Sequence, residues 1–110
     1  MRSGLLTGKM PRERVPTLPS DDWRRKNSDF QEPRLSRNLE LVELLEDLGN
    51  EHGRSPAEVA IAGTLRHPAV TAAIVGGRRP DQVDGIIGAA GFRLGEDELD
   101  RIEAFLDENA

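Results

Sequence analysis

The stretch of sequence that decides the fold is TAAIVGGRRPDQVDGIIGA, residues 71–89. Its first apolar run, residues 73–75, stops at Gly76 and Gly77, and two arginines and a proline then lead into a second apolar stretch. Proline is favoured in the first turn of a helix, where its missing N–H costs nothing. The pattern therefore predicts a strand, a tight turn and a helix that begins at Pro80.

The entry to this predicted helix carries the wrong charge for a bare helix end. Ser, Thr, Asp or Asn normally caps such an end, and acidic side chains suit its positive dipole. Arg78 and Arg79 stand there instead. A bound anion would resolve the conflict, because free N–H groups and two guanidinium groups would all point to it. The turn therefore predicts a phosphate pocket, with an exposed basic turn that binds nothing as the alternative.

These residues resemble the last strand, turn and helix of the aldo-keto reductases. The resemblance rests on GGRRPDQV at residues 76–83 and on the stretch before it, residues 67–75. A second block, GLLTGK at residues 4–9, resembles the turn after the seventh barrel strand of that family. DWR at residues 22–24 and SPAEVAIA at residues 55–62 also match the family pattern. The resemblance thus covers almost the whole chain.

The resemblance implies an α/β fold class, the (β/α)8 TIM barrel, which takes about 300 residues in this family. A chain of 110 residues would be only the C-terminal third of such a barrel. We expect this fragment to be mostly helical in isolation, with about four helices and one short strand. Residues 1–34 would form a cofactor-side loop that follows the seventh barrel strand. Residues 35–110 would form a helical region with the last barrel strand and the helix of the NADP-phosphate site.

The resemblance also implies NADP(H) as the cofactor, since the family holds the adenosine 2′-phosphate end of NADPH on this segment. Arg78 is the strongest candidate for the phosphate contact, and Arg79 either shares the charge or faces solvent. Gln82 matches a family glutamine that hydrogen-bonds the adenosine end. Turn glycines would let the backbone approach the cofactor, and a lysine and an arginine match family residues beside it. The implied cofactor-binding set is Gly4, Lys9, Arg24, Gly76, Arg78, Arg79 and Gln82.

One departure from the family weakens the expected site. Gly85 and Ile86 stand where family members often place Glu-Asn, which contacts the adenine. Two or three phosphate contacts, each worth roughly 1.5–3 kcal/mol at best, do not offset the entropy of binding a flexible dinucleotide. We therefore expect an incomplete site with weak affinity for NADPH.

The family's catalytic Asp, Tyr, Lys and His all come from the part of the barrel that would precede Met1. The chain contains no tyrosine, so the phenol that protonates the carbonyl oxygen during hydride transfer is not supplied here. Neither His52 nor His67 lies in a matching position. The resemblance therefore implies the C-terminal part of an NADP(H)-dependent aldo-keto reductase, an oxidoreductase of aldehydes and ketones, and we expect no catalytic residue and no activity in this chain alone.

A small helical interaction module is the alternative function. The helix expected at residues 59–65 is apolar nearly all round, and Gly63 stands where family members usually carry a bulky aromatic. An exposed apolar face on this helix would drive association. The partner would be a separately encoded portion of the barrel, or a second copy of the chain.

Charge and composition disfavour several other classes. Residues 1–38 hold nine Lys/Arg against five Asp/Glu, whereas residues 39–110 hold six against fifteen, so the helical region is too acidic for a nucleic-acid binder. No apolar run approaches the roughly 20 residues that cross a bilayer. The two histidines lack the spacing of a metal site. Because the chain has no cysteine, a reducing cytoplasm suits it.

The periodicity predicts four helices and leaves one strand alone. Helices are expected at residues 35–52, from Ser55 to residue 65, from Pro80 to about residue 90, and at residues 96–109. Residues 8–34 hold four of the seven prolines and are expected to form one long loop. Residues 72–75 are apolar on both faces, as in a buried parallel strand, but have no partner strand. We therefore expect them to serve as an extended connector. The side chains expected to face inward from the last two helices are Val83, Ile86, Ile87, Leu99, Ile102, Phe105 and Leu106.

Overall fold

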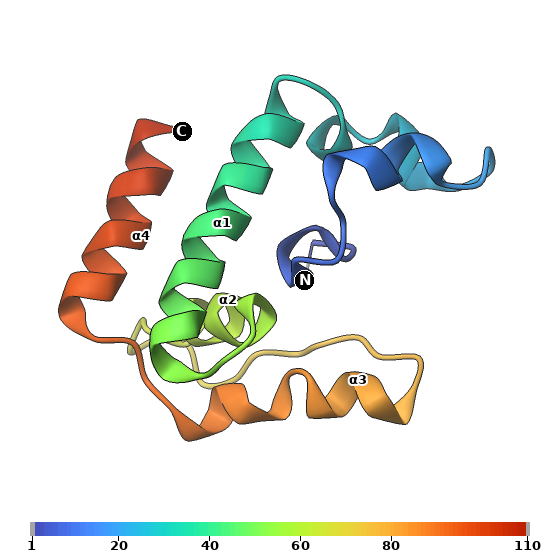
Figure 1. Ribbon diagram of the computed structural model, residues 1–110. Helices are drawn as coiled ribbons and strands as arrows, with labels where there is room; N and C mark the ends of the chain where they lie inside the picture. The colour runs from blue at the N-terminus through green and yellow to red at the C-terminus, as the bar shows by residue number, and fades with distance from the viewer. Residues whose placement is uncertain (1, 110) are drawn as a thin grey trace.

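The computed structural model describes residues 2–109, and within them it contains helices and no strand (Figure 1). Four α-helices carry the architecture. Five short 3-10 helices (η) connect and extend them. The elements are η1 (Leu5–Thr7), η2 (Arg12–Thr17), η3 (Trp23–Lys26), η4 (Ser28–Phe30), α1 (Arg34–His52), α2 (Pro56–Thr64), α3 (Pro80–Asp84), η5 (Ile87–Gly91) and α4 (Glu96–Glu108).

The long helix α1 is the centre of the molecule, and its prediction is confirmed. Leu45 and Leu48 recur at helical spacing and are buried at 3% and 0% exposure. The helix ends at Gly53, whose φ of 65° lies in the left-handed region that glycine adopts without strain. The apolar face of α1 thus becomes the wall against which η1, η4, α2 and α4 pack.

Helix α2 begins with the predicted capping box. The Glu58 N–H donates to Ser55 Oγ at 3.1 Å, and the Ser55 N–H donates to Glu58 Oε1 at 3.0 Å. The connection and α2 both lie close to the end of α1, because a Cβ placed on Gly49 would stand 2.3 Å from the carbonyl oxygen of Arg54 and 3.3 Å from Val59 Cγ2. Only a glycine at this position permits the approach.

Helix α2 does not present the exposed apolar face that the sequence predicted for residues 59–65. Val59 is 0% exposed and Ala62 is 3% exposed, because α1, η1 and η5 cover the helix. The chain therefore buries its most apolar helix internally. The side chains that remain exposed belong to other segments: Trp23, Ile74, Val75, Val83, Ile87 and Leu106.

Residues 8–34 are more structured than the single long loop that the sequence predicted. They contain η2, η3 and η4, and Phe30 is only 2% exposed. A separate apolar cluster explains this order, since side chains of the segment pack against η1 and the start of α1. The cluster consists of Leu5, Met10, Val15, Leu18, Phe30 and Leu35.

The predicted helix from Pro80 to about residue 90 is interrupted. Helix α3 stops at Asp84, and η5 resumes at Ile87 after Gly85 and Ile86. Two glycines in nine residues lower the helix propensity, which gives the break its physical reason. The inward face predicted for this helix is consequently wrong in part: Val83 is 48% exposed and Ile87 is 64% exposed.

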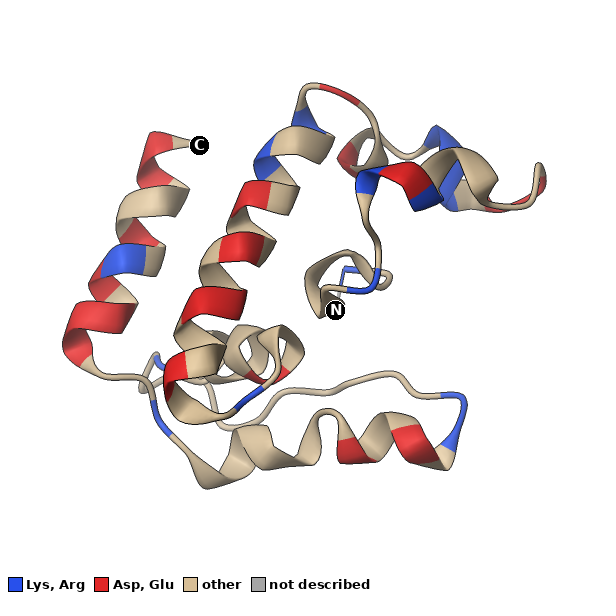
Figure 2. Ribbon diagram, in the orientation of Figure 1, with Lys and Arg blue, Asp and Glu red and all other residues tan. Residues whose placement is uncertain are grey.

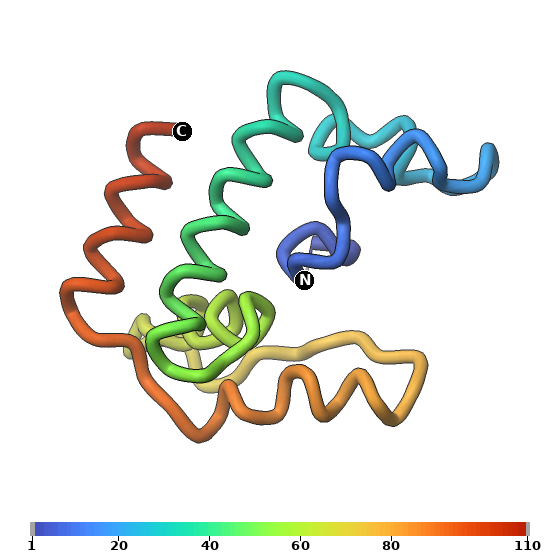
Figure 3. Tube along the Cα trace, viewed as in Figure 1, coloured from blue at the N-terminus to red at the C-terminus, as the bar shows by residue number. Residues whose placement is uncertain are grey.

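Residues 66–91 form an arm that leaves the helices and returns to them. Figure 3 shows the chain running out from α2 in an extended path, turning, and coming back through α3 and η5. Residues 72–75 lie in the outgoing path and pair with no strand within the described part of the chain. The expected extended connector is therefore confirmed, and no short strand forms here.

Helix α4 follows the arm and lies beside α1, close to its predicted bounds (Figure 1). Ile102 is buried on its inner face, while Leu106, predicted inward, is 44% exposed. A hydrogen bond joins the start of α4 to the end of α1, with His52 Nε2 2.7 Å from Glu98 Oε1. Burial raises the pKa of the Glu98 carboxyl, but the Gly95 N–H, His52 and a nearby arginine outweigh it, so its pKa lies below the usual value.

Candidate functional site

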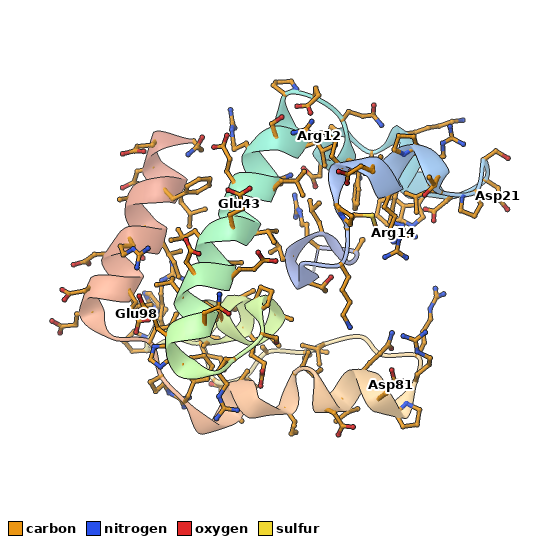
Figure 4. All side chains as sticks on the ribbon, in the orientation of Figure 1. Arg12, Arg14, Asp21, Glu43, Asp81 and Glu98 are labelled. Atoms are coloured by element: carbon orange, nitrogen blue, oxygen red, sulfur yellow. The ribbon has the colours of Figure 1, made fainter. Side chains whose placement is uncertain are left out.

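An open cleft of about 800 Å³ lies between the N-terminal turn and the far end of the arm. In Figure 4 the label Asp21 marks the N-terminal side and the label Asp81 marks the start of α3 on the other side. The cleft brings together five of the seven residues that the resemblance implied, from three separate stretches of sequence. Those five are Gly4, Arg24, Gly76, Arg78 and Gln82.

The N-terminal wall is built around Gly4. Its φ of 91° is a left-handed conformation that other residues adopt only under strain. A Cβ at this position would stand 3.8 Å from Arg24 Nη1, and Arg24 Nη1 donates to the carbonyl oxygen of Ser3 at 3.3 Å. A Cβ would fit there at ordinary van der Waals distance, so the left-handed φ, and not a lack of space, is what favours glycine at position 4.

Arg24 is held by Asp22 rather than free in the cleft. Its Nη2 and Nε donate to the Asp22 carboxylate at 2.6 and 3.0 Å, and its backbone N–H donates to the same group at 3.0 Å. These bonds from Arg24 lower the pKa of the Asp22 carboxyl to about 2, and Asp22 in turn raises the pKa of Arg24. The pair orients Arg24 and at the same time neutralises much of its charge.

On the arm side, Gln82 organises the turn. Its Oε1 accepts from the backbone N–H groups of Arg78 at 2.5 Å and Arg79 at 3.1 Å. The same oxygen lies 3.8 Å from where a Cβ of Gly77 would stand. The two N–H groups at the entry to α3 are therefore occupied by this side chain, which fixes the position from which the Arg78 side chain starts.

Lys9 and Arg79, the other two implied residues, lie outside the cleft. Lys9 is exposed, and its backbone carbonyl accepts from Arg14 Nη1 at 2.6 Å. Arg79 is exposed and pairs with Asp81, with Nε 3.3 Å from Oδ1. Of the two arginines at the basic tip of the arm in Figure 2, only Arg78 lines the cleft.

The cleft also has lining residues that the sequence analysis did not assign to it. Asp21 and Asp22 add negative charge to the cleft, and Trp23, which is 59% exposed, lines it as well. The position of Trp23 between two charged residues, Asp22 and Arg24, was a signal in the sequence that it could line a binding cleft. Because two carboxylates offset Arg24 and Arg78, the cleft is a weaker anion site than its arginines alone suggest.

Within residues 2–109 no cluster of three or more metal-ligating side chains is found. The two histidines are engaged locally, His52 with Glu98 and His67 as acceptor, through Nδ1, from the Ala69 N–H at 3.1 Å. No helix in the same residues is both long and apolar enough to cross a bilayer.

Residues 1–107 match the model of the aldo/keto reductase family. Aldo-keto reductase YhdN of Bacillus subtilis is 32% identical over 105 residues, which are 94% of this chain and 31% of the relative. Probable aldo-keto reductase 1 of Glycine max is 31% identical over 99 residues, 90% of this chain and 28% of the relative. A putative voltage-gated potassium channel subunit beta of Schizosaccharomyces pombe is 27% identical over 110 residues, which cover 96% of this chain and 32% of the relative. The chain thus spans about a third of the length of these curated relatives, and the family resemblance seen in the sequence is confirmed.

Proposed function

Because this chain belongs to the aldo-keto reductase family, we propose that its cleft holds the adenosine 2′-phosphate end of NADPH. The observation that carries the proposal is the meeting of Gly4, Arg24, Gly76 and Arg78 around one opening. These residues are separated by up to 74 positions in sequence and were implied as cofactor contacts independently of the cleft. The cofactor, when bound in a whole family barrel, supplies a hydride for the reduction of an aldehyde or ketone.

Each residue has a distinct task in this proposal. Arg78 provides the charge-assisted hydrogen bonds to the phosphate, and it is the one basic residue of the arm that lines the cleft. Gly4 and Gly76 carry no side chain, so the cofactor can closely approach the backbone of both walls. Gln82 holds the turn through its Oε1, and Asp22 orients Arg24.

The affinity is expected to be low. Asp21 and Asp22 line the same cleft, so an incoming phosphate meets repulsion as well as attraction. Gly85 and Ile86 provide no side-chain hydrogen bond for an adenine. We expect binding of the phosphate end to dominate and binding of the base to add little.

We propose that the chain alone reduces no carbonyl compound. A general acid must protonate the carbonyl oxygen as the hydride arrives, and the sequence contains no tyrosine to do so. In this proposal the chain contributes part of a cofactor site, and residues outside it contribute the chemistry. A reducing cytoplasm, consistent with the lack of cysteine, is the proposed location.

The test is calorimetric titration with adenosine 2′,5′-bisphosphate, and with 5′-AMP as the ligand that lacks the 2′-phosphate. We expect the bisphosphate to bind more tightly, and Arg78→Ala to weaken it about tenfold, the loss of one charge-assisted contact. Arg79→Ala is the matched control, since Arg79 is equally basic but outside the cleft, and should change the affinity less than about threefold. Equal affinity for the two nucleotides, or equal losses in the two variants, would overturn the proposal.

The second candidate function is a module that docks onto a separate barrel portion, and the exposed arm is the observation that favours it. The docking face would be the arm, with Ile74 and Ile87, rather than the buried helix α2. Co-expression with the remaining part of a family barrel tests it. Co-purification of the two chains with carbonyl reductase activity would support it, and separate elution without activity would refute it.

A further inference from the structure

A small apolar cavity lies between helices α1, α2 and α4 and the N-terminal turn η1. Its volume is about 130 Å³, and it shares no lining residue with the large cleft at the arm. Leu45, Val59 and Ile102 line it, and all three are buried. The cavity therefore belongs to the packed helices and not to the proposed cofactor site.

The absence of a side chain on Gly63 leaves room for this cavity. Apart from the backbone of its own helix, the nearest heavy atom to a Cβ on Gly63 would be Ile102 Cδ1, at 3.9 Å, and Ile102 lines the cavity. A larger side chain at position 63 would therefore extend into the cavity from α2. Family members usually carry a bulky aromatic at this position, so the cavity follows from the glycine of this chain and not from a portion of the barrel outside it.

The polar side chains that line the cavity already have partners. Thr64 Oγ1 donates to the carbonyl oxygen of Ala60 at 3.1 Å. Arg66 Nε donates to Glu103 Oε1 at 3.0 Å, and its guanidinium also donates to the Gly63 carbonyl oxygen. The other lining side chains are apolar. A charged ligand would lose its hydration here without a matching partner, which favours an apolar one.

We propose that this cavity binds one small, uncharged, apolar molecule of the size of a single six-membered ring. A protein cavity of roughly 150 Å³ with leucine, isoleucine and phenylalanine walls stays dry and binds benzene or xenon. The cavity beside Gly63 has a similar volume and mostly aliphatic walls. Leu106, which is predicted inward but 44% exposed, also lines it, and a bound ring would remove part of this side chain from water.

The position of the cavity gives binding a consequence for stability. The bound molecule touches residues of α1, α2 and α4 together, and these helices separate when the chain unfolds. A ligand that binds only the folded chain raises the free energy of unfolding as its concentration rises. Binding at this cavity does not require the cofactor, and it holds or fails independently of the cleft.

Benzene is the probe, added to the whole chain and followed by ¹³C-methyl NMR. We expect saturable shifts at the methyl groups of Leu45, Val59 and Ile102, and an unfolding temperature that rises with the benzene concentration. Benzoate has the same ring and a charge, and it should bind at least about tenfold more weakly, because the cavity would strip water from its carboxylate.

Three variants test the position of the site. Gly63→Phe places a ring in the cavity and should weaken benzene binding at least about tenfold. Gly63→Ala adds one methyl group and should weaken it by about threefold, so the test stands even if the larger variant does not fold. Ala104→Phe is the matched control, because Ala104 is exposed on α4 and does not line the cavity, and it should leave the affinity unchanged. Helical circular dichroism reports whether each variant is folded.

The proposal is overturned by methyl shifts that do not saturate, by shifts at other residues only, or by equal affinities for benzene and benzoate. Unchanged benzene affinity in folded Gly63→Phe, or in Gly63→Ala, would overturn it too. Shifts of the same methyl groups with chain concentration, in the absence of benzene, would mean that a second copy of the chain fills the cavity, and that result would contradict the proposal as well.

Discussion

The helices α1 and α2 and the arm at residues 66–91 are both rich in apolar residues, yet only the helices bury them. Leu48 and Val59 are 0% exposed, whereas Ala89 is the one buried residue of the arm. The difference lies in the partners: α1 and α2 complete each other, while the arm has an extended segment that no strand of the described chain can pair. An apolar stretch therefore forms a core only where a neighbouring element among the described residues covers it.

The largest expected change in the free energy of unfolding comes from a substitution in the helices, and the same substitution in the arm should have almost none. Leu48→Ala removes a fully buried side chain from the α1–α2 contact and should lower the free energy of unfolding by about 2–5 kcal/mol. Ile74→Ala removes a fully exposed side chain and should change it by less than about 0.5 kcal/mol. Urea denaturation of the two variants measures both values. A comparable loss in Ile74→Ala would mean that the arm is packed in solution and that the contrast is wrong.

Alanine substitutions at two helical glycines, Gly49 and Gly63, test how closely the core is packed around each of them. Gly49→Ala should destabilise the fold by about 1–3 kcal/mol, because its Cβ would meet the Arg54 carbonyl oxygen at 2.3 Å. Gly63→Ala should stabilise it by about 0.5–1 kcal/mol, since the nearest atom, Ile102 Cδ1, is 3.9 Å away and alanine is the better helix former. Thermal unfolding followed at 222 nm compares them. A Gly49→Ala variant as stable as the unchanged chain would contradict the close approach of the Arg54 carbonyl group to α1.

Ser55 connects helix α2 to the arm, and removal of its hydroxyl group should lower the free energy of unfolding by an intermediate amount. Its Oγ caps α2 and also donates to the carbonyl oxygen of Gly85 in the arm at 3.0 Å. Ser55→Ala should cost about 1 kcal/mol of stability through the lost cap. Amide hydrogen exchange should become faster at residues 85–91 as well as at the start of α2. Faster exchange in α2 alone would show that the bond to the arm contributes nothing.

The smallest expected effect is the pH dependence of stability that comes from Asp22, one of the two carboxylates in the cleft. The pKa of the Asp22 carboxyl is lowered from 3.8 to about 2, so the stability gained from its bonds to Arg24 is present above about pH 4. That contribution is lost as the pH falls from about 4 to about 2. A carboxyl NMR titration should place Asp22 near the lower value, and Arg24→Gln should return it toward 3.8. An Asp22 pKa near 3.8 in both forms would mean that the pair does not exist in solution.

The sequence predicted best what depends on neighbouring residues. The bounds of α1 and α2 follow from Gly53 and the Ser55–Glu58 capping box, whose signals are complete within a few residues. The interruption after Asp84 was missed, although Gly85 and Gly88 both signal it, because the periodicity of the apolar residues was given more weight. Residues 72–75 were predicted as an extended connector, and the structure confirms this, but the exposure of the arm as a whole was not predicted.

The sequence predicted which residues could line the cleft, but it did not predict how they are arranged in space. The family pattern implied Gly4, Arg24, Gly76, Arg78 and Gln82, and all five line the opening. Nothing local in the sequence indicates that Lys9 and Arg79 point elsewhere, because that depends on how the arm folds back toward the N-terminal turn. The fixed Asp22–Arg24 pair is likewise a tertiary arrangement as much as a local one, since Arg24 also reaches Ser3.

A ¹H–¹⁵N correlation spectrum of the labelled chain, recorded with and without NADPH, tests the central claim most directly. The account predicts dispersed resonances for α1 and α2, and shifts on addition of NADPH at residues 3–4, 21–24 and 76–82, with smaller shifts on addition of NADH. Collapsed resonances, or a spectrum in which the cofactor moves only peaks outside the cleft, would contradict it.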